Sequence, residues 1–189
     1  VHLMVPVADR DRMLWLAEKV TELGLASWRP VMYRRSKGVN PRGEGTTFQQ
    51  KLRARMAGAL EQSRGAWLPV TFPEASIEHA IAGRPPGIAF VLDQGARPLF
   101  SALGPAIERA RQEKKPVPAI TLAVGPEGGF EPNELAALEA SGFARVSLAS
   151  DILRFETAAL AGLAAIRATL EWQSAAFPDI GLSAEEPRT

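Results

Sequence analysis

Short apolar runs alternate along the chain with longer stretches in which apolar residues recur every three or four positions. The short runs suit strands buried on both faces, and the longer stretches suit amphipathic helices. Strands are predicted at residues 1–7, 28–33, 68–72, 88–92, 119–124 and 145–148. Helices are predicted at residues 9–23, 47–63, 73–82, 98–112, 132–142 and, after a loop at 149–155, up to about residue 176. This alternation is typical of an α/β fold, a mostly parallel sheet with helices on both faces.

Local signals mark several helix ends. Asp9 is placed to cap the first helix, and Gly24 is placed to end it. Thr47 and Gln50 fit a capping box that opens the second helix. Pro132 suits the first turn of a later helix, because its missing N–H is not needed there.

A glycine-rich segment, Gly125 to Phe130, follows the apolar run at residues 119–124. Ligands of open α/β sheets bind at the carboxyl ends of strands, where such a loop lies. Glycine lets a backbone approach a ligand closely and adopt positive φ. The loop is therefore predicted to form one wall of a small-molecule site. The alternative is a tight strand-to-helix turn, although three glycines are more than such a turn requires.

The spacing of this loop argues against a phosphate cradle. A P-loop needs lysine and then serine or threonine after its last glycine, whereas Phe130 and Glu131 follow Gly129. The dinucleotide fingerprint G-x-G-x-x-G is not matched either. Glu127 would repel phosphate, so the loop better suits a cationic or polar ligand.

Composition narrows the chemistry further. The 189 residues include no cysteine and two histidines, which excludes disulfides and cysteine nucleophiles and argues against a protein-bound transition metal. No apolar stretch is long enough to span a bilayer and no signal peptide is visible, so we expect a cytoplasmic protein. We expect one domain at residues 1–176, with a flexible tail at 177–189. Because the chain starts at Val1 inside a predicted strand, we expect it to be a fragment or a trimmed form.

Net charge is only +1, but positive charge is concentrated in the first third of the chain. Such clustering is typical either of a face that contacts phosphates or of an ordinary solvated surface. The cluster comprises Arg34, Arg35, Lys37, Arg42, Lys51, Arg53, Arg55 and Arg64.

A second segment of interest, Leu153 to Ala158, precedes the final alanine-rich helix. Glu156 has a structural explanation there, because a carboxylate is favoured in the first turn of a helix. Arg154 taken alone is an ordinary surface arginine. These two residues gain a functional interpretation only in combination with the glycine loop.

The two segments together resemble the RsmE family of 16S ribosomal RNA uridine N3-methyltransferases, which belong to the SPOUT class of S-adenosylmethionine (SAM) enzymes. The residues that carry the resemblance are 125–129 and 152–158, with further matches at 18–24, 35–36 and 61–64. The similarity extends over roughly residues 1–170.

This resemblance implies a trefoil knot near the C-terminus and a homodimer formed through it. It also implies that an N-terminal RNA-binding domain of the PUA type, usual in the family, is absent from this chain. SAM would be held by loops that follow Leu92, span Gly125–Gly129 and run from Leu148 to Leu153. The implied SAM-binding residues are Leu92, Val124, Gly125, Glu127, Gly128, Gly129, Leu148, Ile152 and Leu153.

The resemblance also assigns chemistry to the second segment. N3 of uracil must lose a proton before it attacks a methyl group, and a fixed guanidinium stabilises the resulting anion. Arg154 is our candidate for that role, and the base would be Glu156, Glu127 or water. The cations expected to contact RNA phosphates are Arg34, Arg35, Lys37, Arg53, Arg55 and Arg64.

Two alternatives stay open at this point. One is a non-catalytic RNA-binding or ribosome-assembly module that keeps the same fold. The other is a doubly wound enzyme that uses a different nucleotide cofactor.

Overall fold

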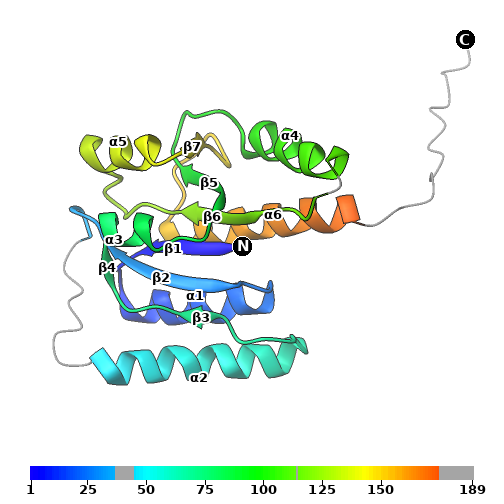
Figure 1. Ribbon diagram of the computed structural model, residues 1–189. Helices are drawn as coiled ribbons and strands as arrows, with labels where there is room; N and C mark the ends of the chain where they lie inside the picture. Colours follow the sequence, from blue (N-terminus) through cyan, green and yellow to red (C-terminus); the bar gives the residue numbers. More distant parts are fainter. Residues whose placement is uncertain (37–44, 114, 175–189) are drawn as a thin grey trace, which may run out of the picture.

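The computed structural model describes residues 1–36, 45–113 and 115–174 (Figure 1). The tail predicted at 177–189, and the loop that precedes the second helix, lie outside these residues. In chain order the elements are β1 (His2–Pro6), α1 (Arg10–Glu22), β2 (Ser27–Met32), α2 (Gly45–Ser63), β3 (Val70–Thr71), β4 (Ala75–Ser76), α3 (Ile77–Ala82), β5 (Gly87–Leu92), α4 (Leu99–Gln112), β6 (Ala119–Ala123), α5 (Pro132–Ala140), β7 (Phe143–Val146) and α6 (Phe155–Ser174).

The strands form one seven-stranded sheet in the order β3-β2-β1-β6-β5-β7, with β4 pairing the far end of β2. Every pairing between these strands is parallel. The register aligns Met4 with Ala123, and Phe90 with both Leu122 and Ala144. The carboxyl ends of β1, β6, β5 and β7 therefore meet along one edge of the sheet, as Figure 1 shows for their arrowheads.

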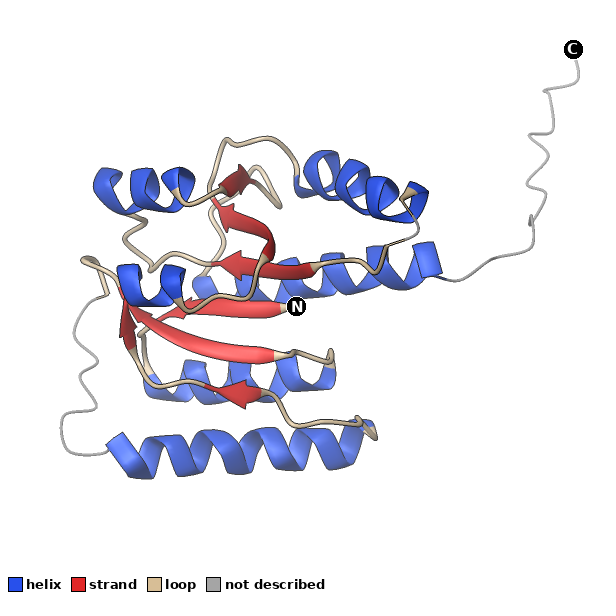
Figure 2. Ribbon diagram, in the orientation of Figure 1, coloured by secondary structure: helices blue, strands red, loops and turns tan. Residues whose placement is uncertain are grey.

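Helices cover both faces of the sheet (Figure 2), and the alternation of side chains along each strand explains why. Leu3 and Val5 of β1 point to one face, where they join the core formed with α1, α2, α4 and α6. Met4 points to the other face and packs with α3 and α5. Phe90 and Ala89 of β5 divide between the two faces in the same way. The predicted α/β fold with a mostly parallel sheet is confirmed, and the trefoil knot stays a prediction.

The ends of α1 agree with the sequence signals. The Asp9 carboxylate accepts hydrogen bonds from the backbone N–H groups of Asp11 and Arg12, each at 3.1 Å. Gly24 follows the last turn with φ of +70°, a conformation that a residue with a side chain rarely adopts.

Several predicted boundaries are wrong. Helix α2 already begins at Gly45, so Thr47 lies inside the first turn instead of at the N-cap. The helix predicted at 73–82 is shorter, because Ala75 and Ser76 add a short strand to the exposed end of β2. Ser76 then caps α3 by accepting a hydrogen bond from the backbone N–H of His79 at 3.4 Å.

Strand β7 also starts two residues before the prediction of 145–148. Phe143, which is 3% exposed, packs against the core that contains α3 and α5 and so extends the strand at its amino end. The strand also ends two residues before the predicted end, so Leu148 belongs to the loop that follows it.

Candidate functional site

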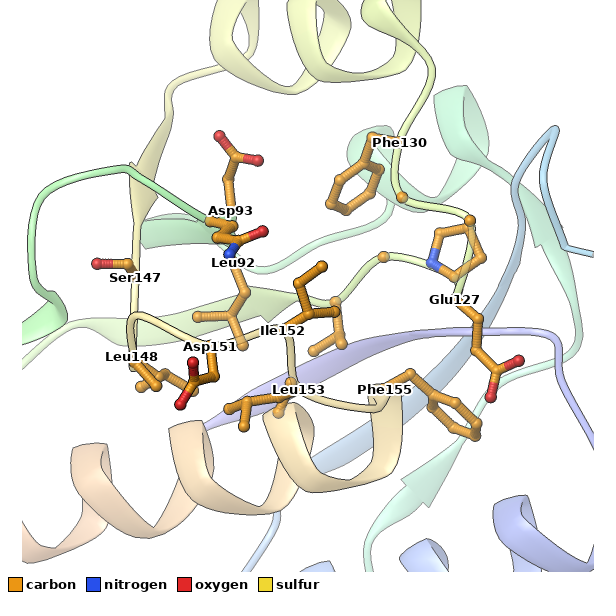
Figure 3. A pocket seen from close by; sticks show the side chains of 18 residues that line it. Leu92, Asp93, Glu127, Phe130, Ser147, Leu148, Asp151, Ile152, Leu153 and Phe155 are labelled. Atoms are coloured by element: carbon orange, nitrogen blue, oxygen red, sulfur yellow. The ribbon is translucent and has the colours of Figure 1, made fainter.

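A cavity of about 330 Å³ opens at the carboxyl ends of β6, β5 and β7, next to the start of α6 (Figure 3). The loops that follow these three neighbouring strands form its walls. All nine residues that the resemblance implied for SAM binding line this one cavity: Leu92, Val124, Gly125, Glu127, Gly128, Gly129, Leu148, Ile152 and Leu153. Segments that are far apart in the sequence are thus brought together because their strands are adjacent.

The cavity also contains residues outside these nine. Asp93, Phe130, Ser147, Asp151 and Phe155 line it as well. Phe130 and Asp151 lie within the predicted loops, whereas Ser147 and Phe155 were not predicted as site residues.

The glycine loop has a conformation that requires two of its glycines. Gly129 has φ of +74°, and its N–H closes a turn by donating to the carbonyl of Pro126 at 2.8 Å. A Cβ atom at Gly125 would lie 2.9 Å from the Phe130 ring. The loop is therefore both a tight turn and a wall of the cavity, so the two interpretations of its sequence are compatible.

Helix α6 packs closely beneath the apolar wall of the cavity. A Cβ atom built on Gly162 would lie 2.6 Å from Cδ2 of Leu122, 3.5 Å from Cδ1 of Leu92 and 3.6 Å from Cδ1 of Leu148. In Figure 3 the side chains of Leu148 and Leu153 lie directly above this helix. The absence of a side chain at Gly162 thus lets α6 approach Leu122 of β6 closely, while the cavity-lining Leu92 and Leu148 lie at ordinary contact distance from the same position.

Asp93 at the end of β5 pairs with a cation. The Arg145 guanidinium on β7 donates two hydrogen bonds to Oδ2 of Asp93, the one from Nε at 2.8 Å. The hydrogen bond to Asp93 raises the pKa of Arg145 above its ordinary value. The two residues thus form an ion pair across the neighbouring strands β5 and β7.

Arg12 of α1 connects two carboxylates of the candidate site. Its guanidinium Nη1 hydrogen-bonds Oε1 of Glu127 in the glycine loop and lies 3.8 Å from Oε2 of Glu156 at the start of α6. The Glu127 hydrogen bond is the largest cause of a raised pKa of Arg12. Oε2 of Glu156 is buried and has no hydrogen-bond partner among the described residues. Sequence reasoning missed Arg12, because only the strand order brings α1 beside the loop that follows β6.

Arg154 lies at the boundary of α6, where its backbone carbonyl accepts a hydrogen bond from the N–H of Ala158 at 2.9 Å. Its neighbours Leu153 and Phe155 line the cavity, whereas the Arg154 side chain is exposed and is not part of the lining. The structure therefore does not bring the Arg154 guanidinium into the cavity with the nine residues.

Arg35 is the one member of the predicted RNA-contacting set that, among the described residues, touches the glycine loop. Its guanidinium donates to the carbonyl of Gly128 at 2.7 Å and to Oε1 of Glu131 at 2.5 Å. Arg35 thus contacts the glycine loop at Gly128 and, just beyond the loop, Glu131.

The other predicted RNA contacts are distributed over the surface. Arg53 and Arg55 lie on α2, Arg64 follows its last residue, and all three side chains are exposed. Arg55 pairs with Glu18 at 3.3 Å. The exposed side chain of Arg34 is next to Arg35, and Lys37 lies outside the described residues.

Metal-binding clusters and membrane-spanning helices are both absent from residues 1–36, 45–113 and 115–174. These residues contain no group of three histidine, aspartate or glutamate side chains suited to a metal ion. None of their helices combines the length and the apolar character needed to cross a membrane.

Comparison with known proteins gives consistent matches. Residues 1–167 match the family model of the RNA methyltransferase domain. The chain is 33% identical over 157 residues to a ribosomal RNA small subunit methyltransferase E of Synechocystis, covering 80% of this chain and 47% of that protein. It is 44% identical over 59 residues to a protein of the same name from Mycobacterium tuberculosis, covering 31% of this chain and 22% of that protein.

Solved structures show the same fold. A Neisseria gonorrhoeae ribosomal RNA small subunit methyltransferase E bound to SAM superposes with a TM-score of 0.74 at 26% identity, covering 89% of this chain and 65% of that one. A methyltransferase from Legionella pneumophila, at 23% identity and a TM-score of 0.76, has the same coverage and shares the fold. The chain spans about half the length of the Synechocystis relative.

Proposed function

Since this chain belongs to the family of RNA methyltransferase domains, we propose that it transfers a methyl group from SAM to N3 of a uridine in 16S ribosomal RNA. The observation that carries the proposal is the convergence of three loops, from three adjacent parallel strands, on one cavity. The relatives named for small-subunit ribosomal RNA methylation support the choice of RNA.

The cavity suits SAM chemically. SAM supplies an electrophilic methyl group on a cationic sulfonium. Leu92, Leu148 and Leu153 offer an apolar wall for a flat base, and the turn at Gly125–Gly129 brings backbone groups to the cavity surface. The carboxylate of Glu127 complements a cationic ligand, while it would oppose a phosphate.

The residues of the chain would then have to generate a nucleophile at N3. In our proposal Arg154 stabilises the uridine anion through its guanidinium, and its exposed position leaves it accessible to RNA. Glu156, Glu127 and water are the candidate bases. Glu127 is 56% exposed and Glu156 is 12% exposed, so Glu127 is the more accessible of the two carboxylates.

RNA binding would use cations that do not read sequence. The proposed phosphate contacts are Arg34, Arg35, Lys37, Arg53, Arg55 and Arg64. We also propose that the chain acts as a homodimer in the cytoplasm, with residues 1–176 as the methyltransferase domain.

The first experiment is calorimetric titration of the chain with SAM and, as a control, with NAD. Saturable SAM binding without NAD binding is expected. The loaded protein is then incubated with unmodified small ribosomal subunits and with naked 16S RNA, and nucleosides are analysed by mass spectrometry for 3-methyluridine. SAM binding without any methyl transfer would favour the RNA-binding or assembly module, and binding of NAD alone would favour the other nucleotide enzyme.

A further inference from the structure

A second cavity, of about 530 Å³, adjoins the first one. The two cavities share Pro126, Glu127 and Gly128 of the glycine loop as a common wall. The remaining walls of the second cavity come from the segments that follow β1 and β2, on the side of β6 away from β5. The glycine loop therefore stands between a cavity suited to SAM and a cavity that has no role so far. Glu127, labelled in Figure 3, belongs to this shared wall.

Four charged side chains line the second cavity. The Asp9 carboxylate already accepts hydrogen bonds from the first turn of α1, and the other three are Arg12, Arg35 and Glu127. Arg12 contacts the Glu127 carboxylate, and Arg35 is held by the Gly128 carbonyl and by Glu131. The three side chains of Arg12, Glu127 and Arg35 are 36%, 56% and 44% exposed, so each is fixed but open to a ligand. A guanidinium has five N–H donors, and these contacts leave several of them unused.

This set offers two donor groups and one acceptor group. The Watson–Crick edge of uracil has the complementary groups, which are the O2 and O4 acceptors and the N3–H donor. Cytosine does not fit, because its N3 lone pair would face a carboxylate and its amino group would face a guanidinium. A site that hydrogen-bonds a base edge discriminates against a base that leaves its polar groups unpaired, and partial exposure of those groups to water reduces the discrimination.

We propose that the second cavity binds the uracil ring of the acceptor nucleotide, with Arg12 and Arg35 donating to its carbonyl oxygens and Glu127 accepting from N3–H. This inference rests on the proposed function, adds the subsite for the base and assigns Arg35 to the base instead of to a phosphate. An enzyme that modifies a base edge must take the base out of its stack, and a cavity of this kind receives such a base. Glu127 would place N3 at the wall that both cavities share.

The test is a titration of the chain with uridine 5′-monophosphate and cytidine 5′-monophosphate, followed by NMR of the backbone amides, with and without saturating S-adenosylhomocysteine. Uridine monophosphate is expected to shift the amides of Ala8, Ser36 and Gly128, and cytidine monophosphate is expected to bind about tenfold more weakly. Arg12→Met is expected to weaken uridine binding by about tenfold or more, because it removes a charged hydrogen bond. The affinity for S-adenosylhomocysteine should fall less than the affinity for uridine monophosphate in this variant, because Arg12 does not itself line the first cavity.

A second variant gives a readout that a purely structural role would not change. In Glu127→Gln the amide can donate to N3 of cytosine, so the preference for uridine over cytidine monophosphate should fall. The control Lys115→Met removes an exposed cation that pairs with Glu113 far from both cavities, and it should leave both affinities unchanged.

Several results would overturn the inference. Equal binding of the two nucleotides, shifts that map away from the second cavity, or an unchanged preference in Glu127→Gln would each do so. Equal loss of uridine and S-adenosylhomocysteine binding in Arg12→Met would make Arg12 a support of the first cavity instead. Failure of the proposed function would be seen separately, as absence of binding to SAM and S-adenosylhomocysteine by the unsubstituted chain.

Discussion

Arg12 illustrates how single residues organise this site. Its contacts reach Glu127 and Glu156, which lie in segments far apart in the sequence. The side chains of Arg12 and Glu127 are at least one-third exposed, so their ion pair contributes little to the stability of the fold. The value of the contact is that it fixes the direction of a carboxylate in the wall between two cavities.

Arg154 gives the most direct test of the proposed chemistry. Replacing Arg154 with alanine is expected to lower the rate of methyl transfer by about 10²-fold, because loss of one electrostatic donor has about that effect in other enzymes. The affinity for SAM should not change, because the side chain is outside the cavity. Single-turnover transfer to small subunits measures the rate, and Arg154→Lys should restore part of it. Transfer at the parent rate would remove Arg154 from the mechanism.

His2 gives a prediction for pH dependence. Its Nδ1 lies 2.8 Å from the Ser27 hydroxyl across the β1–β2 pair, and partial burial, followed by the positive chain terminus, lowers its pKa below the ordinary value of 6.5. Because the folded state has the lower pKa, protonation favours the unfolded state. The free energy of unfolding is therefore at its full value above the unfolded pKa and falls as the pH drops from there through the folded pKa.

Urea titrations between about pH 5 and pH 8 measure this effect. The decline on acidification should be smaller in His2→Gln, which keeps a hydrogen-bonding group but does not titrate. An identical decline in the two proteins would assign the pH dependence to other groups.

At the scale of elements, α6 controls the shape of the first cavity. Gly162→Ala would place a methyl group 2.6 Å from Cδ2 of Leu122, so that Leu122 or the helix beside the cavity must shift. We expect a decrease of about 1–3 kcal/mol in the free energy of unfolding, together with weaker SAM binding. Urea titration and calorimetry measure the two effects.

Gly58→Ala is the matched control for this substitution. Gly58 lies in α2, and a Cβ atom there would meet nothing within 4 Å. Because glycine weakens a helix interior, this variant should be stabilised by about 0.5–1 kcal/mol. Equal effects of the two substitutions would show that α6 is not closely packed at Gly162.

The helices and strands also show which parts of the fold could be predicted from the sequence alone. The strands and helices with regular apolar spacing were predicted, because burial on a fixed face leaves that period in the sequence. The short strand at Ala75–Ser76 was not, because its pairing depends on where β2 ends. The contacts of Arg12 were not predicted either, since they follow from β1 lying beside β6, and sequence did not fix the strand order. Of the nine cavity residues, the four in the glycine loop were predicted from glycines that follow a strand, and the other five from the family resemblance.

At the scale of the whole molecule, charge is unevenly distributed despite a net charge of only +1. If the cations on α2 and directly after it bind RNA phosphates, removing three of them should weaken RNA binding and make it less dependent on salt. The logarithmic salt slope should become shallower by about 0.7 for each phosphate that is no longer neutralised. The substitutions are Arg53→Gln, Arg55→Gln and Arg64→Gln. Filter binding of 16S RNA over a range of salt concentrations measures the slope.

A control with the same change in charge uses exposed cations from the later part of the chain. It combines Arg97→Gln, Arg109→Gln and Lys115→Gln. The two triple variants should differ in their salt slope, and SAM affinity should be unchanged in both. Equal slopes would mean that net charge, and not the α2 surface, determines RNA affinity.

The wall shared by the two cavities, formed by Pro126, Glu127 and Gly128, has a thermodynamic consequence. A ligand that binds in one cavity and moves this shared wall changes the free energy with which the other cavity binds its own ligand. The effect must be reciprocal. If a filled first cavity fixes Glu127 in the position that a uracil needs, the cofactor and the base bind cooperatively. S-adenosylhomocysteine, the cofactor after methyl transfer, would then favour binding of the base as effectively as SAM does. Release of the modified nucleotide would therefore depend on the new N3 methyl group, which replaces the proton that Glu127 had bound.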